Sequence, residues 1–308
     1  MKKLALGIAL LLACAAGALY LYPGALVASM KFIERQQAGL SPREIEVDGL
    51  TIHYYEGGPA QGETLLMVHG FAASRDNWLR FARYFTHRYH VLALDLPGFG
   101  ESSRADISYD VASQAERVRA FANALKVERL HLIGNSMGGH ISALYAARHP
   151  EQVLSLALFD NAGVTAPHKS EMIQLLERGE PNPLVARNAE EFDALLNFVF
   201  VSPPALPDSL KRHFAEQSMA NREHHERIFA QLRERYVPLE PELPKIQSPT
   251  LLLWGDKDRV LDVSSIEVMK PLLKQPSVVI MQNCGHAPMI ERPEETARHY
   301  QAFLDSLK

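Results

Sequence analysis

The chain has 308 residues, of which 47% are hydrophobic and 22% charged; this length and composition exclude a disordered or collagen-like protein and suit one large α/β domain with an insertion. Its formal net charge of −4 at pH 7 offers no broad basic surface, so we expect no nucleic-acid partner. The two cysteines, Cys14 and Cys284, exclude a disulfide framework and a cysteine-rich metal site, and we expect no metal.

The N-terminal end predicts a membrane anchor, residues 1–30. After Lys2 and Lys3, no charged side chain occurs from Leu4 to Met30. At about 1.5 Å per residue, a helix of this length exceeds a hydrocarbon core of about 30 Å. The two lysines keep the N-terminus in the cytoplasm by the positive-inside rule, which sends the rest of the chain across the membrane. The lipid bilayer is therefore a predicted partner, and a homodimer formed through the anchor is a second partner hypothesis.

Two other interpretations of this end stay open. The small residues Ala13-Cys14-Ala15 resemble a signal-peptide cleavage site, and Leu11–Cys14 loosely resembles a lipoprotein box. In a signal peptide the apolar run normally stops after about 7–15 residues, whereas this run continues. We therefore favour an uncleaved anchor.

Residues 31–41 are predicted to form a juxtamembrane amphipathic linker. Within the predicted anchor, Pro23-Gly24 is expected to kink or end the membrane span. A stretch of this kind is expected either to lie at the membrane interface or to form an ordinary linker helix. The apolar residues at helical spacing are Leu26, Val27, Met30 and Ile33.

From residue 42 onward, short β-rich apolar runs alternate with helical patterns, which predicts an α/β fold with a mostly parallel central sheet and flanking helices. Asp48-Gly49 predicts a hairpin between the first two strands, at one edge of the sheet. The predicted strands are Glu44–Val47, Thr51–Tyr55, Thr64–Val68, Val91–Leu94, Leu130–Gly134, Val153–Phe159, Thr250–Trp254 and Val278–Met281.

Between Gly163 and Tyr236 the strand signals fade, and helical patterns separated by prolines predict an inserted helical cap, residues 163–236. The core of the α/β domain is accordingly expected at residues 42–162 and 237–308. His224 and His225, in the cap, lack the carboxylate or cysteine cluster expected of a metal site and are expected to be solvated. The predicted cap helices are Met172–Arg178, Glu190–Phe200, Asp208–Met219 and Arg222–Tyr236.

The candidate nucleophile is Ser136. It lies in the segment Gly134–Gly138, a G-x-S-x-G pattern between an apolar strand and a helix-forming run. The glycines at either end let the backbone turn sharply, so that the serine is held exposed over the sheet edge. The alternative, an ordinary helix N-cap serine, fits this strand–turn–helix context less well.

A serine nucleophile needs a base and an acid that orients the base, expected in the chain order Ser, acid, His. His286 follows the last predicted strand, at the sheet edge where α/β proteins place their ligands. Asp256 and Asp258 follow the preceding strand, and we select Asp258 as the acid. Asp160, at the end of the strand before that one, is a rival because it could reach the same histidine.

The backbone amides of Phe71 and Met137 are predicted to hold the oxyanion. Phe71 follows His69-Gly70 at the end of a strand, and Met137 follows the nucleophile. Their side chains are expected to be incidental to this role. Asp95–Gly100 is expected to be a structural turn rather than a catalytic part.

A resemblance to the α/β-hydrolase family rests on the whole set of motifs and covers the chain from about residue 42 onward. The motifs are His69-Gly70-Phe71, Asp95–Gly100, Gly134–Gly139, Trp254–Asp258 and Cys284-Gly285-His286. Within the family, the anchor, Trp254–Val263 and Asn283–Pro293 resemble the abhydrolase-domain monoacylglycerol lipases and, more closely, the membrane-anchored bacterial phospholipases A of the PlaF type. This resemblance implies Ser136, Asp258 and His286 as the triad and a glycerolipid or lysophospholipid as substrate. It also implies a bacterial inner membrane, with the catalytic domain on the periplasmic side.

The predicted function is that of a membrane-anchored serine hydrolase that cleaves carboxyl esters of lipids through an acyl-enzyme and requires no cofactor. Serine at the nucleophile position excludes the dehalogenases and epoxide hydrolases of this fold, which need an aspartate there. A carboxylesterase or carbon–carbon hydrolase with small soluble substrates, and a ligand-sensing module of the hydrolase fold, stay open as alternatives.

The most apolar stretch of the cap is predicted to line the acyl pocket, because a long acyl chain needs an apolar channel. Packing within the cap is the other interpretation of this stretch. Its residues are Phe192, Leu195, Leu196, Phe198, Val199 and Phe200.

Overall fold

The computed structural model describes residues 22–308. The predictions made on residues 1–21, which form most of the expected anchor, lie outside this range. No helix within residues 22–308 combines the length and the apolar character needed to cross a bilayer. The first described element is the helix α2 (Pro23–Ala38), which begins at the proline expected to interrupt the span. Proline suits the first helical position because its missing N–H is not needed there.

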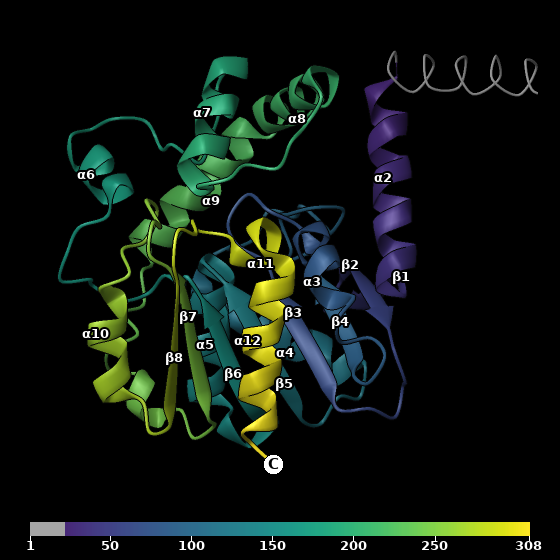
Figure 1. The fold of residues 1–308 in the computed structure, drawn as a ribbon, viewed down its shortest axis with the longest axis vertical. Coiled ribbons are helices and arrows are strands. Elements are labelled where there is room, and N and C mark those ends of the chain that lie inside the picture. Colours follow the sequence, from purple (N-terminus) through teal and green to yellow (C-terminus); the bar gives the residue numbers. More distant parts are fainter. Residues whose placement is uncertain (1–21) are drawn as a thin grey trace, which may run out of the picture.

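An eight-stranded sheet forms the centre of the domain, in the order β1-β2-β4-β3-β5-β6-β7-β8 (Figure 1). The strand β2 is antiparallel to both of its neighbours, and all other pairs are parallel, as the alternating pattern predicts. Each predicted strand is present, and several extend beyond their predicted ends. The bounds are β1 (Leu40–Val47), β2 (Leu50–Gly57), β3 (Thr64–Val68), β4 (His90–Leu94), β5 (Leu130–Asn135), β6 (Val153–Phe159), β7 (Thr250–Gly255) and β8 (Pro276–Met281).

Side chains alternate between the two faces of the sheet, and each face buries its own apolar core. In β3, Leu66 and Val68 belong to a core that includes residues of α4 (Val111–Ala124) and α5 (Met137–Arg148). Leu65 and Met67 point to the opposite face and pack with residues of α3 (Leu79–Ala82) and α12 (Pro293–Asp305). Because helices cover both faces, every residue of β3 is buried. The shorter helices are η1 (Arg75–Trp78), η2 (Pro150–Gln152), η3 (Leu243–Lys245), α10 (Ser265–Met269), η4 (Lys270–Leu272) and α11 (Pro288–Glu291).

Four α-helices follow β6 and precede β7, and they form a layer above the edge where β6, β7 and β8 end (Figure 1). They are α6 (Glu171–Glu177), α7 (Ala189–Val199), α8 (Asp208–Ala220) and α9 (Arg222–Glu234). The last one stops before the predicted end at Tyr236, because Val237 precedes a proline and such residues disfavour the helical conformation. This layer is the segment predicted as a helical cap.

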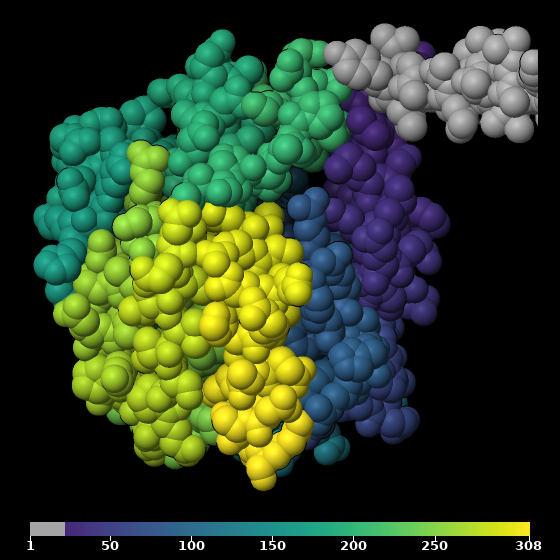
Figure 2. Space-filling model, viewed as in Figure 1, coloured from purple at the N-terminus to yellow at the C-terminus, as the bar shows by residue number. Residues whose placement is uncertain are grey.

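The helix α2 lies along the side of the domain, against α3 and α8 (Figures 1 and 2). Its Lys31 pairs with Asp76, and its Glu34 pairs with Arg80. The expected boundary between anchor and linker, at residue 31, therefore falls inside one continuous helix that is docked on the domain. Ile33, expected on the apolar face, is 53% exposed.

Candidate active site

Ser136 lies at a sharp turn between β5 and α5. Its backbone torsion angles, φ 57° and ψ −122°, belong to a region that residues with a side chain rarely adopt. Two glycines make room for this turn. A Cβ on Gly134 would lie 2.3 Å from the carbonyl oxygen of Gly138, and one on Gly138 would lie 2.3 Å from that of Val68. The local geometry is that of a strained strand-to-helix elbow, as the G-x-S-x-G pattern predicts.

The side chain of Ser136 is more buried than this elbow led us to expect, with 8% of the residue exposed. The loop that follows β3 crosses close to it, since a Cβ on Gly70 would lie 3.1 Å from the Cβ of Ser136. Phe71, one of the two residues predicted to supply the oxyanion amides, therefore lies in a segment against the elbow, and Met137, the other, directly follows Ser136.

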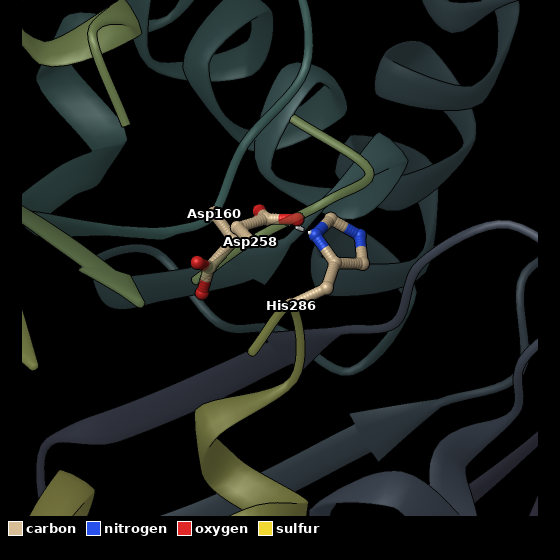
Figure 3. A group of neighbouring side chains, drawn as sticks. All are labelled: Asp160, Asp258 and His286. Carbon is tan, nitrogen blue, oxygen red and sulfur yellow. Dashed lines mark hydrogen bonds and ion pairs between the residues drawn. The ribbon is translucent and has the colours of Figure 1, made fainter. Parts of the chain in front are cut away.

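His286 and Asp258 form a buried hydrogen-bonded pair (Figure 3). The distance between His286 Nδ1 and Asp258 Oδ2 is 2.8 Å. The other carboxylate oxygen, Oδ1, accepts hydrogen bonds from the amides of Val260 and Leu261, at 2.8 and 3.0 Å. These two amides hold the carboxylate in the orientation that faces the imidazole.

The neighbouring acid, Asp256, has a different position. Its Oδ1 accepts a hydrogen bond from the amide of Asn283 at 2.6 Å. This bond connects the loop after β7 to the loop after β8. Asp256 therefore shapes the turn, while Asp258 faces the histidine.

The loop that carries His286 is bonded to both the elbow and the cap. Asn135 Nδ2 donates to the carbonyl oxygen of His286 at 3.1 Å. The His286 amide donates to the carbonyl oxygen of Val199, at the end of α7, at 2.8 Å. Glu291 accepts from the amides of Gly285 and Ser202, both at 2.9 Å. Asn135 and Glu291 were not among the predicted site residues, and only their closeness to the motifs in the sequence could have indicated them.

Asp160, the rival acid, is fully buried beside the pair (Figure 3). Its Oδ1 accepts a hydrogen bond from the Gly255 amide at 2.8 Å. Burial raises the pKa of Asp160 well above its usual value, and the charge of Asp258 raises it further. Asp160, Asp258 and His286 each offer a ligand atom within 4.8 Å of the others, a spacing that a metal ion could use. The Asp258 oxygens and His286 Nδ1 are already engaged in the hydrogen bonds described above.

The amides of Phe71 and Met137 donate no hydrogen bond to any group within residues 22–308. Met137 begins α5, where the helix dipole favours negative charge. His69 holds the Phe71 loop in place, because its Nδ1 lies 2.7 Å from the Gly70 carbonyl oxygen and its Nε2 accepts from the Leu96 amide at 3.0 Å. Burial lowers the pKa of His69, which favours the neutral ring that this acceptor role requires.

The turn at Asp95–Gly100 is built on buried ionic contacts. Asp95 accepts hydrogen bonds from the amides of Arg75 and Glu101, at 2.7 and 3.0 Å. The Arg75 guanidinium, which is also buried, lies 3.1 Å from Asp95 Oδ2. These contacts fit the structural turn expected from the sequence.

The side chain of Phe71 is not incidental to the structure. It packs against Phe99 of this turn and against His225 and Phe229 of the cap helix α9. His225 stacks on Phe99, is only 8% exposed, and has its pKa lowered by burial to about 4. His224 Nε2 lies 2.8 Å from the Gly98 carbonyl oxygen. The expectation that both histidines are solvated is wrong, because α9 packs directly onto the turn.

The residues predicted to line the acyl pocket have different surroundings. Phe198 is buried in a small cluster with Met172 and Val260. Val199 and Phe200 pack against the core on the sheet face that α3 and α12 cover. Phe192 and Leu195 are half-buried. Leu196 lines a cavity of about 630 Å³ bounded by α7, residues 203–207 and Lys211 of α8. None of the candidate triad residues Ser136, Asp258 and His286 lines this cavity. The acyl pocket therefore stays a prediction.

Comparison with known proteins agrees with the resemblance that the motifs indicated. A family model described as alpha/beta hydrolase fold matches residues 63–293. Lipase 1 of Psychrobacter immobilis is 37% identical over 279 residues, 86% of this chain and 86% of its own. The monoacylglycerol lipase abhd6-B of Xenopus laevis is 30% identical and covers 94% of this chain and 89% of its own.

Among solved structures, a membrane phospholipase A, described as a bacterial virulence factor, is 66% identical. The two structures superpose with a TM-score of 0.92 over 100% of this chain and 99% of that one. The chain therefore belongs to the α/β-hydrolase family and is a carboxylic ester hydrolase.

Proposed function

We propose that the chain is a membrane-anchored serine hydrolase that cleaves carboxyl esters of lipids through an acyl-enzyme. The observation that carries this proposal is the buried Asp258–His286 pair beside the strained elbow of Ser136. The lipid substrate class is supported by the similar proteins, which include a lipase, a monoacylglycerol lipase and a membrane phospholipase A.

In this mechanism His286 is the general base. Its Nδ1 donates to Asp258, and Nε2, which has no hydrogen-bond partner among residues 22–308, takes the proton of Ser136 Oγ. The oxygen attacks the ester carbonyl, and the amides of Phe71 and Met137 donate to the oxyanion. His286 then returns the proton to the leaving alcohol. A water molecule, activated by the same base, releases the fatty acid and restores Ser136.

The anchor gives this site access to membrane lipids. Lys2 and Lys3 favour a cytoplasmic N-terminus, which puts the catalytic domain on the periplasmic side of a bacterial inner membrane. The docked helix α2 would hold the domain close to the bilayer surface. The bilayer is then both the attachment surface and the source of substrate.

The test uses the purified full-length chain in detergent. A fluorophosphonate is expected to label the protein, and Ser136→Ala is expected to abolish both labelling and ester hydrolysis. Ser277→Ala, which changes an exposed serine of β8, serves as the matched control. Labelling that persists in Ser136→Ala would place the nucleophile elsewhere.

The substrate class is tested with the same preparation. Monoacylglycerol, a lysophospholipid and a diacyl phospholipid are compared with a short aryl ester and with a dienoate ring-cleavage product. Faster turnover of a lipid ester supports the proposal. Turnover of the dienoate alone would indicate a carbon–carbon hydrolase, and binding without turnover of any compound would indicate a sensing module.

A further inference from the structure

One buried carboxyl group beside the triad has no role in the mechanism above. Asp160 directly follows the strand β6 and is 0% exposed. Its Oδ1 accepts from the Gly255 amide, but Oδ2 is buried and has no hydrogen-bond donor in the part of the chain that the structure describes. A buried carboxylate with a single donor is costly to keep ionised.

The groups around Asp160 are predominantly acidic. They come from every neighbouring loop: Asp258 after β7, Cys284 and His286 after β8, and Glu291 in α11. The pKa of Asp160 is raised first by burial, then by the charge of Asp258, and further by the charge of Glu291. Burial also raises the pKa of the Cys284 thiol, so that this neighbour is neutral too.

The hydrogen bonds indicate which oxygen of a neutral Asp160 carries the proton. Oδ1 already accepts the Gly255 N–H, so it serves as the carbonyl oxygen of the acid. Oδ2 faces no donor and is free to carry the hydrogen. The Asp258 carboxylate has an oxygen within 4.8 Å of an Asp160 oxygen and is the group positioned to accept this hydrogen. Asp258 already receives donors from the Val260 and Leu261 amides and from His286, and a proton on Asp160 Oδ2 would add a further donor.

We propose that Asp160 is a protonated positioning residue whose Oδ2–H donates to the Asp258 carboxylate and tunes how strongly that carboxylate stabilises the His286 imidazolium. This inference rests on the proposed serine-hydrolase mechanism. Asp160 keeps its proton throughout, because the only proton that moves in acylation passes from Ser136 to His286 and then to the leaving alcohol. The added hydrogen bond disperses the charge of Asp258, so the imidazolium is stabilised less than it would be beside a carboxylate without this donor.

The first test compares Asp160→Asn with Asp160→Ala. Asparagine can accept the Gly255 N–H with Oδ1 and donate to Asp258 with Nδ2, so it mimics the neutral acid. Its kcat is expected to stay within about threefold of the unmodified enzyme. Alanine removes the donor, so Asp258 stabilises the imidazolium more strongly, and we expect the acidic limb of the kcat/KM profile to move to higher pH. An acidic limb that does not move in Asp160→Ala would overturn the proposal. A large loss in Asp160→Asn would show that a charged carboxylate is needed and would overturn the proposal.

The second test detects the proton without using activity. At neutral pH, the infrared spectrum of the full-length protein is expected to contain the C=O stretch of a protonated carboxylic acid, and Asp160→Asn is expected to remove it. Asp256→Asn, in the neighbouring loop, is the control and should leave the band in place. Absence of the band, or its persistence in Asp160→Asn, would overturn the proposal. This result is independent of Ser136 labelling, so failure of the proposed function and failure of this inference are distinguishable.

Discussion

Replacing Asp258 by asparagine is expected to reverse the tautomer of His286. The amides of Val260 and Leu261 both donate to Oδ1, at 2.8 and 3.0 Å, so the asparagine must turn its carbonyl oxygen toward them. Its NH₂ group then faces His286 Nδ1 in place of an acceptor oxygen. The imidazole can satisfy this donor only by accepting at Nδ1, which moves the proton to Nε2. A ring protonated at Nε2 cannot take the proton of Ser136.

The size of the loss follows from this reversal. In serine-hydrolase triads the wrong tautomer lowers kcat by about 10⁴-fold, which corresponds to about 5 kcal/mol of activation free energy. The two amides that donate to Oδ1 fix the orientation of the asparagine side chain at position 258, so we expect a loss of the same order. The assay is hydrolysis of a short soluble ester by the full-length protein, with KM expected to change little because the aspartate does not touch the substrate.

The matched control is Asp256→Asn in the same loop, whose hydrogen bond to the Asn283 amide can be kept by an amide oxygen. Its kcat is expected to stay within about threefold of the unmodified enzyme. A loss below about tenfold in Asp258→Asn would refute the tautomer argument. Equal losses in the two variants would mean that the loop as a whole, and not the acid–base pair, was disturbed.

Glu291→Gln replaces an acceptor of the Gly285 and Ser202 amides and is expected to lower kcat about tenfold, because it loosens the loop that carries His286. The exposed Glu294→Gln is the control, and an unchanged kcat in Glu291→Gln would contradict this prediction. Because the pKa of His225 is lowered from 6.5 to about 4, its neutral form stabilises the fold fully above pH 6.5, and this contribution is lost as the pH falls toward about 4. In His225→Phe the melting temperature should therefore fall less steeply over that range, and an equally steep fall would count against the assignment. A protein that begins at Tyr22 is expected to hydrolyse short esters like the full chain but vesicle lipids more slowly, whereas one that begins at Ser41 loses the ion pairs of α2 and should melt at a lower temperature. Equal rates on vesicles for the Tyr22 protein and the full chain would remove the role of the anchor in substrate delivery.

The strands were predictable because buried parallel strands are continuous apolar runs bounded by turn residues. The ends of the strands were less predictable, since pairing across the sheet decides where a strand stops. The strand β1 begins at Leu40, before the predicted Glu44, because Leu40 pairs with Gly57 at the far end of β2. The charged and polar residues at the start of β1 conceal this pairing in the sequence.

The members of the candidate triad were identifiable because each lies in a short motif after a strand, where local sequence determines local geometry. The surroundings of these residues could not be identified from the sequence. The contacts of Asn135 and Glu291 join segments that are distant in the sequence, and no spacing rule connects them. His225 was misjudged for the same reason, since only the packing of α9 on Phe99 removes it from water. Asp160 was recognised as an acid at the right sheet edge, but its burial depends on three neighbouring loops.

The cap is bonded to the same two loops that hold Asp258 and His286. Arg259, next to Asp258, pairs with Glu171 of α6 and donates to the Asn197 carbonyl oxygen of α7 at 3.1 Å. Glu291 and the His286 amide bond the end of α7 to the histidine loop. Movement of α6 and α7 away from the sheet would therefore break contacts on both sides of the Asp258–His286 pair, whereas α8, which packs on α2, shares no such bond with either loop within the described residues. Substrate entry beside α8 would leave the acid–base pair intact, and entry beneath α7 would not.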